Sequence, residues 1–182
     1  MSNAATQPNK TMSGASSSSL SRLPLESASS STLSIPAKAR LSRELSRLQK
    51  DPPPGIAAYL ETDDNLSLWR ADIVGPPDSP FQGGVFRLAI KFPPRYPMEP
   101  PSCRFISHPA PHHPNIDSSG RICLDTLKSP PSGTWSPAVS LSSLLLSLRS
   151  LLVEPHPDDG LLVVDISQQY RLHPEQWRAE AK

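Results

Sequence analysis

The chain has 182 residues, which suggests one domain with an appendage, and its net charge of +1 gives no basic field of the kind that binds nucleic acid. Two cysteines and no recognisable signal peptide lead us to expect a reducing compartment, and no apolar run approaches the roughly 20 residues that a membrane span needs. Proline is frequent and clustered, with 23 residues against 8 glycines, which predicts many conformationally fixed loops.

Residues 1–35 are rich in serine, with runs at 16–19 and 29–31, and their few leucines are isolated. Such a segment cannot bury enough apolar surface to offset the entropy of ordering. It is therefore predicted to be a disordered tail, and the ordered domain is expected to span residues 36–182.

A helix is predicted from Ala37 to Gln49, with Pro36 just before its first turn. Three leucines recur there at helical spacing: Leu41, Leu45 and Leu48. The basic residues of this segment fall largely off that stripe, and a solvated basic face is their simplest interpretation. The proline run at 52–54 ends the helix, because proline cannot continue it.

Four strands are predicted after this helix, at Ile56–Thr62, Leu66–Val74, Val85–Phe92 and Ser102–Ile106. Turn-forming and proline-rich segments separate them. Short connections of this kind produce an antiparallel meander, which needs a covering layer on one face. The sequence therefore predicts an α+β fold in which a four-stranded antiparallel meander packs against helices.

The most regular apolar pattern lies between Val139 and Val153. Six leucines fall there on one face of a predicted helix at about 100° per residue: Leu141, Leu144, Leu145, Leu148, Leu151 and Leu152. Leu146 falls nearly opposite, and a solitary exposed leucine needs no explanation by itself. A last helical segment, Ile166–Lys182, is expected to be interrupted at His173-Pro174.

Between the last strand and the leucine-rich helix, a turn-rich loop ends on Cys123, outside any core-like apolar run. Reactive groups often lie on loops, and a thiol is a good nucleophile where its thiolate is accessible. Asn115, eight residues earlier, can place an amide N–H near a carbonyl bound to the sulfur, where an oxyanion develops. The loop therefore suggests acyl transfer through cysteine, with a half-buried structural cysteine as the ordinary alternative.

A metal site is another alternative, because three histidines and Cys123 lie close together in the sequence: His108, His112 and His113. Structural zinc sites normally use paired ligands, such as two cysteines two residues apart matched by a second pair. The sequence has no such pairs, so no zinc site is predicted.

The blocks His113–Ile116 and Gly120–Asp125 resemble the active-site signature of ubiquitin-conjugating enzymes in order and spacing. The Tyr-Pro-x-x-Pro-Pro segment at 96–101 and the loop Ser136–Ala138 continue the resemblance, which covers residues 36–182. It implies the ubiquitin-conjugating (UBC) fold. It also implies that Cys123 accepts the carboxyl terminus of ubiquitin as a thioester from the ubiquitin-activating enzyme and passes it to a lysine of a protein substrate with a RING-type ligase. It further implies that this step needs no metal or organic cofactor, because in this family the activating enzyme consumes the ATP.

The resemblance also assigns roles to individual residues. Catalysis would use Cys123, Asn115 as the oxyanion donor and Asp159 as the group that orients the lysine and accepts its proton. Contacts with ubiquitin would come from Leu124, Asp125 and Leu146. The activating enzyme and ligases would meet Arg40, Arg43, Met98, Ser136, Pro137 and Ala138, while His113 and Pro114 would hold the loop. Asp159 could instead cap the following helix, and Met98 could simply fill a gap.

The extra residues between Leu127 and Trp135 are most similar to the T-type members of this family, which belong to the Fanconi anaemia pathway. This similarity suggests a role in DNA repair, with nucleus and cytoplasm both expected as locations. Ser136 departs from the basic residue of the T-type enzymes, and Gly160 departs from the usual proline after the aspartate. Ala57 stands where some relatives have a serine that binds a second ubiquitin, which favours monoubiquitination.

Three other functions stay open at this point. A conjugating enzyme for a ubiquitin-like modifier would carry the same motifs. A ubiquitin-binding variant of the fold would lack the cysteine. A cysteine hydrolase would need a base hydrogen-bonded to the thiol and oriented by a third group.

Overall fold

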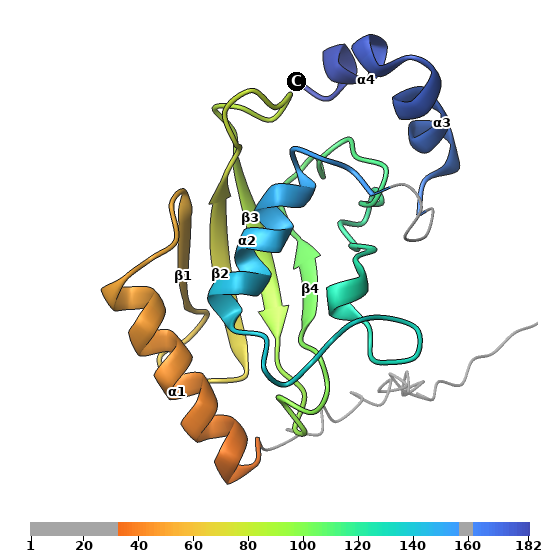
Figure 1. Cartoon of the computed structure of the whole chain (residues 1–182). Helices are drawn as coiled ribbons and strands as arrows, with labels where there is room; N and C mark the ends of the chain where they lie inside the picture. Colours follow the sequence, from red (N-terminus) through yellow and green to blue (C-terminus); the bar gives the residue numbers. More distant parts are fainter. Residues whose placement is uncertain (1–32, 157–161) are drawn as a thin grey trace, which may run out of the picture. The chain divides into compact units, whose positions relative to one another are not determined.

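The computed structural model describes residues 33–156 and 162–182, and within them four strands form one antiparallel sheet in the order β1-β2-β3-β4 (Figure 1). The strands are β1 Ile56–Leu60, β2 Leu68–Val74, β3 Val85–Lys91 and β4 Ser102–Phe105. The helices are α1 Ile35–Lys50, the short 3₁₀ helix η1 Asp125–Leu127, α2 Leu141–Leu151, α3 Val164–Leu172 and α4 Pro174–Glu180. The predicted α+β meander is confirmed. In the described ranges no helix is long and apolar enough to span a membrane.

The predicted tail, residues 1–35, lies outside the described residues except for its last three. Of these three, Ile35 is the first residue of α1 and Ser34 is its N-cap: the Ser34 hydroxyl accepts from the Ala37 amide at 3.3 Å, and Pro36 occupies the first turn. The helix therefore begins at Ile35, two residues before the predicted start.

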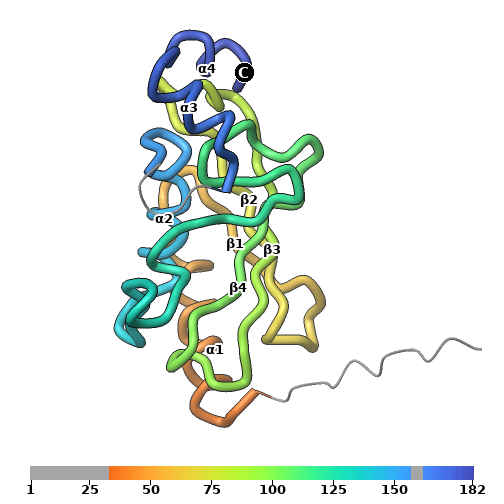
Figure 2. The backbone as a smooth tube through the Cα atoms, turned by 90° about the vertical axis from the view of Figure 1, so that its right-hand side faces the viewer, coloured from red at the N-terminus to blue at the C-terminus, as the bar shows by residue number. Residues whose placement is uncertain are grey.

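Helix α2 covers one face of the sheet, as the two perpendicular views show (Figures 1 and 2). All five leucines of its predicted stripe inside the helix are buried: Leu141, Leu144, Leu145, Leu148 and Leu151. They face the inward side chains of β2, Trp69, Ala71 and Ile73, which are also buried. Each buried leucine stabilises the fold by about 1.5–3 kcal/mol, so the packing of α2 on the sheet is a large apolar contribution to the stability of the domain.

Strand β2 begins at Leu68, two residues later than predicted, for a local reason. The Asn65 side-chain oxygen accepts from the amide and the hydroxyl of Ser67, at 2.9 and 2.6 Å. This Asx-type turn holds residues 65–67 out of the ladder. The strand then pairs with β1 and β3 in a continuous register.

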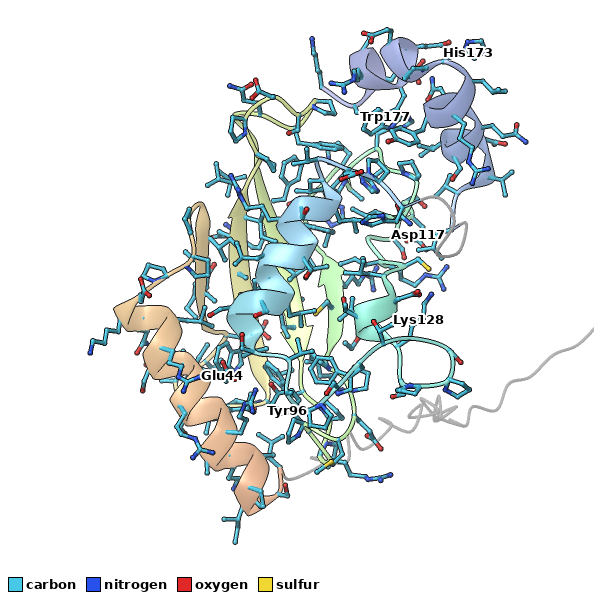
Figure 3. The ribbon with its side chains drawn as sticks, viewed as in Figure 1. Glu44, Tyr96, Asp117, Lys128, His173 and Trp177 are labelled. Carbon is cyan, nitrogen blue, oxygen red and sulfur yellow. The ribbon has the colours of Figure 1, made fainter. Side chains whose placement is uncertain are left out.

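A buried ion pair fixes α1 to the start of α2. Glu44 is 1 % exposed; its carboxylate accepts from Arg40 Nε at 2.7 Å and from the Leu141 amide at 3.4 Å. The Arg40 guanidinium also donates to the Val139 carbonyl at 3.0 Å. A buried carboxylate is costly unless it is paired and hydrogen-bonded, and these contacts satisfy it. Glu44 lies on the inner side of α1 in Figure 3.

The C-terminal segment forms two helices that break at His173-Pro174, as predicted. Trp177 of α4 is 1 % exposed, packs edge-on against Tyr170, and donates from its indole nitrogen to the His112 carbonyl at 3.2 Å. The last helix therefore holds the loop that leads into the His113–Ile116 block.

Candidate active site

The loop between Asn115 and Cys123 is built around the Asp117 carboxylate, which lies beside the loop in Figure 3. One of its oxygens accepts from the Ser119 amide and hydroxyl and from the Arg121 amide, at 2.7–3.0 Å; the other accepts from Arg121 Nε at 2.6 Å. Burial alone would raise the pKa of Asp117, but the bonds from Ser119 and Arg121 outweigh it and lower the pKa to about 2. This role of Asp117 was not predicted, although an aspartate two residues before Ser119 is a recognisable turn signal.

Gly120 completes this turn with a left-handed backbone, at φ +82°. A Cβ at this position would lie 1.9 Å from the Phe105 carbonyl oxygen, so only glycine lets the loop approach β4 this closely. The Phe105 amide donates to the Gly120 carbonyl at 2.9 Å, and Arg104 forms a bridge with Arg121. The loop is therefore attached to the edge of the sheet.

Cys123 follows directly from this attached loop. Its amide donates to the Asn115 carbonyl at 2.8 Å, and its side chain is partly exposed. The other cysteine, Cys103, is buried in β4, where burial raises the pKa of its thiol to about 12. Neither cysteine forms a disulfide, so Cys123 is the thiol that a large substrate can reach.

The Asn115 side chain is buried and bridges to the backbone of His156. Its Nδ2 donates to the His156 carbonyl at 2.7 Å, and its Oδ1 accepts from the His156 amide at 3.0 Å. This pair of bonds ties the loop before Cys123 to the segment after α2. Asn115 was predicted only as an oxyanion donor. The bridge to His156 was not predicted, because the two residues are 41 positions apart in the sequence.

His113 is fully buried, and both of its ring nitrogens are engaged. Nε2 lies 2.8 Å from the Leu151 carbonyl, which can only accept, and Nδ1 accepts from the Asn115 amide at 3.0 Å. Burial is the main cause that lowers the pKa of His113 to about 4, so the ring is neutral at pH 7. With both nitrogens occupied in these bonds, His113 holds the loop and is not itself placed to act as the base of a hydrolase dyad with Cys123.

Beyond Cys123, Leu124 and Asp125 differ in their surroundings. The Leu124 side chain is 7 % exposed and packs in the core, which leaves mainly its backbone for the predicted contact with ubiquitin. Asp125 opens η1, and one carboxylate oxygen accepts from Lys128 Nζ at 3.0 Å. Leu146, the third residue predicted to contact ubiquitin, is 42 % exposed on α2.

The residues predicted to meet ligases lie on two loops that Trp135 joins. Its indole nitrogen donates to the Pro97 carbonyl at 2.8 Å, next to Met98, which is 67 % exposed. Ser136 follows Trp135 and is partly exposed, and Pro137 and Ala138 are exposed. The two loops therefore form one surface.

On α1 the two predicted contact arginines differ. Arg43 is exposed and free to meet a partner through its full side chain. Arg40 is bound to Glu44 and to Val139, so a partner that pulled it away would leave a buried carboxylate without its charge partner.

Asp159, the predicted catalytic carboxylate, and its neighbour Gly160 lie outside the described residues. Within residues 33–156 and 162–182, no group of three or more histidine, cysteine, aspartate or glutamate side chains is placed to hold a metal ion.

Comparison with known proteins agrees with this geometry. The family model for ubiquitin-conjugating enzymes matches residues 40–182. The Xenopus laevis protein named ubiquitin-conjugating enzyme E2 T is 47 % identical over 144 residues, which cover 79 % of this chain and 73 % of the relative. The Danio rerio and Bos taurus proteins of the same name are 44 % and 48 % identical, covering 79 % and 73 % of this chain and 72 % and 66 % of their own lengths.

These matches confirm the predicted resemblance, including its T-type character, and the predicted enzyme class. The family model alone spans more than half of the chain and includes both loop surfaces and the Cys123 block. The chain belongs to the family of ubiquitin-conjugating enzymes.

Proposed function

We propose that Cys123 accepts the carboxyl terminus of ubiquitin from the activating enzyme as a thioester and passes it to a lysine of a protein substrate. The observation that carries this proposal is the position of Cys123, which is partly exposed at the end of a fixed loop. The loop is held by the Asn115 carbonyl, by the Asp117 carboxylate and by its bonds to β4. A thioester suits the task because it keeps acylating power while its sulfur remains a good leaving group.

The second step is attack of a neutral lysine amine on the thioester carbonyl, which creates an oxyanion. The Asn115 amide nitrogen carries two hydrogens, and its bond to His156 uses one of them, so the other can serve the oxyanion. Asp159 is proposed to orient the amine and to accept its proton. The amine nitrogen forms the new C–N bond, and the Cys123 sulfur leaves as a thiolate.

Partners are proposed from the exposed surfaces. The joined loops with Met98 and Ser136–Ala138 suit a RING-type ligase, because a flexible methionine adapts to varied apolar partners. Arg43 on α1 suits the activating enzyme, and Leu146 suits ubiquitin held against α2 during transfer. The cellular role is proposed from the sequence resemblance to the T-type enzymes and from Ala57: monoubiquitination in DNA repair, in the nucleus and cytoplasm.

The test is a charging reaction with activating enzyme, ATP and ubiquitin, analysed with and without reducing agent. We expect one ubiquitin adduct that thiols remove, and a Cys123→Ser variant whose oxygen ester survives thiols. Adding free lysine should then discharge the wild-type adduct. Charging by a ubiquitin-like modifier with its own activating enzyme, but not by ubiquitin, would replace the proposed substrate, and an adduct that forms equally on Cys123→Ala would overturn the proposal.

A further inference from the structure

Trp177 of α4 connects the C-terminal helices to the loop that carries Asn115. Its side chain is 1 % exposed and lies on the side of α4 that faces the domain (Figure 3). Its Nε1 donates to the His112 carbonyl at 3.2 Å, across 65 positions of sequence. Tyr170 of α3 packs edge-on against the same indole, with ring centroids 5.0 Å apart. The indole is therefore fixed by α3, and its N–H holds the residue just before His113.

Three aromatic rings from distant segments meet at His113. The rings of Trp177 and His113 lie edge-on, with centroids 6.4 Å apart. Phe81 of the β2–β3 loop lies 6.1 Å from the His113 ring and 6.3 Å from the Trp177 ring. The His113 side chain is fully buried, and its Nε2 lies 2.8 Å from the Leu151 carbonyl at the end of α2. The position of the imidazole thus depends on α2, on α4 and on the β2–β3 loop together.

The position of His113 in turn determines that of Asn115. Its Nδ1 accepts from the Asn115 backbone amide at 3.0 Å. The Asn115 side chain then bonds to the backbone of His156, which uses one of its two amide hydrogens. Because an amide group is planar, these bonds also fix the direction of the second hydrogen. A shift of the backbone at 112–113 would therefore turn away the hydrogen that an oxyanion needs.

We propose that Trp177 is a positioning residue for the transfer of ubiquitin to lysine: its N–H, by holding the His112 carbonyl, keeps the Asn115 amide directed at the developing oxyanion. The proposal rests on the proposed function for the identity of the acyl group. Trp177 acts through the loop and takes no part in the bonds that form and break at the thioester carbon.

The size of the effect follows from what else holds the loop. Misplacing a reacting group by about 1 Å can cost about a hundredfold in rate. His112 keeps a second contact with α3, because its Nε2 lies 3.2 Å from Gln169 Oε1, and His113 keeps its contact with Leu151. Loss of the Trp177 bond alone is therefore expected to slow transfer by much less than a hundredfold.

The first test removes the indole N–H but keeps an aromatic ring, in Trp177→Phe. Single-turnover discharge of the ubiquitin adduct at saturating lysine should slow about three- to tenfold, with little change in the lysine concentration that gives half the maximal rate. Alkylation of Cys123 by iodoacetamide forms no oxyanion and should keep its wild-type rate. Gln176→Ala is the matched control, because it removes an exposed 3.1 Å bond to Glu180 within the same helix and should change neither rate.

A double variant separates positioning from packing. Asn115→Ala removes the donor, so adding Trp177→Phe to it should slow discharge no further, because the two residues act as one unit. A purely structural role of Trp177 predicts instead the same slowing with and without Asn115. That result, or wild-type discharge by a folded Trp177→Phe protein, would overturn the proposal.

A third measurement changes no packing and needs no ubiquitin. An analogue at Trp177 with sulfur in place of the indole N–H keeps the shape of the ring, so the fold is preserved. Hydrogen exchange of the Asn115 backbone amide should become about three- to tenfold faster, while that of Ala71 in β2 stays unchanged. Unchanged exchange at Asn115 would overturn the proposal. Failure of the wild type to charge with ubiquitin would count against the proposed function and leave this readout standing.

Discussion

The two cysteines lie on adjacent pieces of backbone yet in opposite chemical settings. Cys103 belongs to β4 and pairs with Ile90 in the ladder, while Cys123 ends the loop that Arg121 attaches to the same strand next to Arg104. Cys103 is buried among apolar side chains, and Cys123 is partly exposed, two residues before Asp125 of the Asp125–Lys128 ion pair. The comparison shows that strand β4 provides a fixed edge for attachment. The loop attached to it exposes the thiol of Cys123, so that a substrate can reach it.

What distinguishes the two settings is how the backbone is satisfied. The strand uses ladder bonds, so its side chains alternate and Cys103 is forced inward. The loop uses side-chain acceptors, Asp117 and Asn115, in place of a ladder. The side chains of Asp117 and Asn115 therefore hold the backbone of the active loop, as the neighbouring strand holds β4. Loss of these side chains should remove the difference in setting between the two cysteines.

The largest expected effect is the difference in reactivity between the two thiols. With its pKa raised to about 12, Cys103 should alkylate about a thousandfold more slowly than a thiol of ordinary pKa near 8.5, before its burial is considered. Peptide mapping after a short exposure of the native protein to iodoacetamide should find the label on Cys123 alone. Comparable labelling of Cys103 under native conditions would contradict the difference between the two thiols. Labelling of both cysteines after unfolding provides the positive control.

Asn115→Ala should have the next largest effect. It removes both bonds to His156 and the proposed oxyanion donor, and loss of one such donor typically costs about 10²–10³ in rate. Single-turnover discharge of the ubiquitin adduct onto lysine measures this loss. Alkylation of Cys123, which forms no oxyanion, should fall far less; an equal fall in both rates would assign Asn115 a purely structural role.

The Asp117 carboxylate predicts a pH-dependent contribution to stability. Its pKa is lowered from an ordinary 3.8 to about 2, so its stabilisation is fully present above pH 4 and is lost as the pH falls toward 2. At pH 7, Asp117→Asn should lower the free energy of unfolding by about 1 kcal/mol, because it weakens bonds to partly exposed groups. Denaturant unfolding of both proteins between pH 7 and 2 should show this difference shrinking below pH 4. A constant difference would contradict the role given to the charge.

The smallest effect is expected from Cys103→Ala. Removing one buried sulfur should cost about 1 kcal/mol of unfolding free energy and leave charging with ubiquitin unchanged. Thermal unfolding and the charging reaction measure these two quantities separately. Loss of charging in a variant that is still folded would show that β4 contributes more than a scaffold.

Much of the fold could be predicted because its signals are local. The leucine stripe of α2, the break at His173-Pro174 and the turn chemistry between strands each act within a few residues. The observed strand boundaries differ from the predicted ones where a side chain hydrogen-bonds to the backbone, as Asn65 does just before β2. The cysteine block was also predictable, since loop composition and spacing lie in one stretch of sequence.

The rest depends on partners that are distant in the chain. Glu44 bonds the Leu141 amide 97 residues away, and Asn115 bonds the backbone of His156, so no local pattern marks either residue as a connector. Leu124 is predicted to contact ubiquitin, and because its side chain packs in the core, that contact falls mainly to its backbone. The ion pair between Lys128 and Asp125 was not predicted, because a lysine in a proline-rich loop is usually solvated.

The most direct test is the intact mass of the protein after incubation with activating enzyme, ATP and ubiquitin, for the wild type, Cys103→Ala and Cys123→Ala. We predict that the wild type and Cys103→Ala gain the mass of a single ubiquitin less one water, that reducing agent removes it, and that Cys123→Ala gains nothing. A thiol-sensitive ubiquitin adduct on Cys123→Ala, or none on the folded wild type, would contradict the assignment of Cys123 as the acyl carrier.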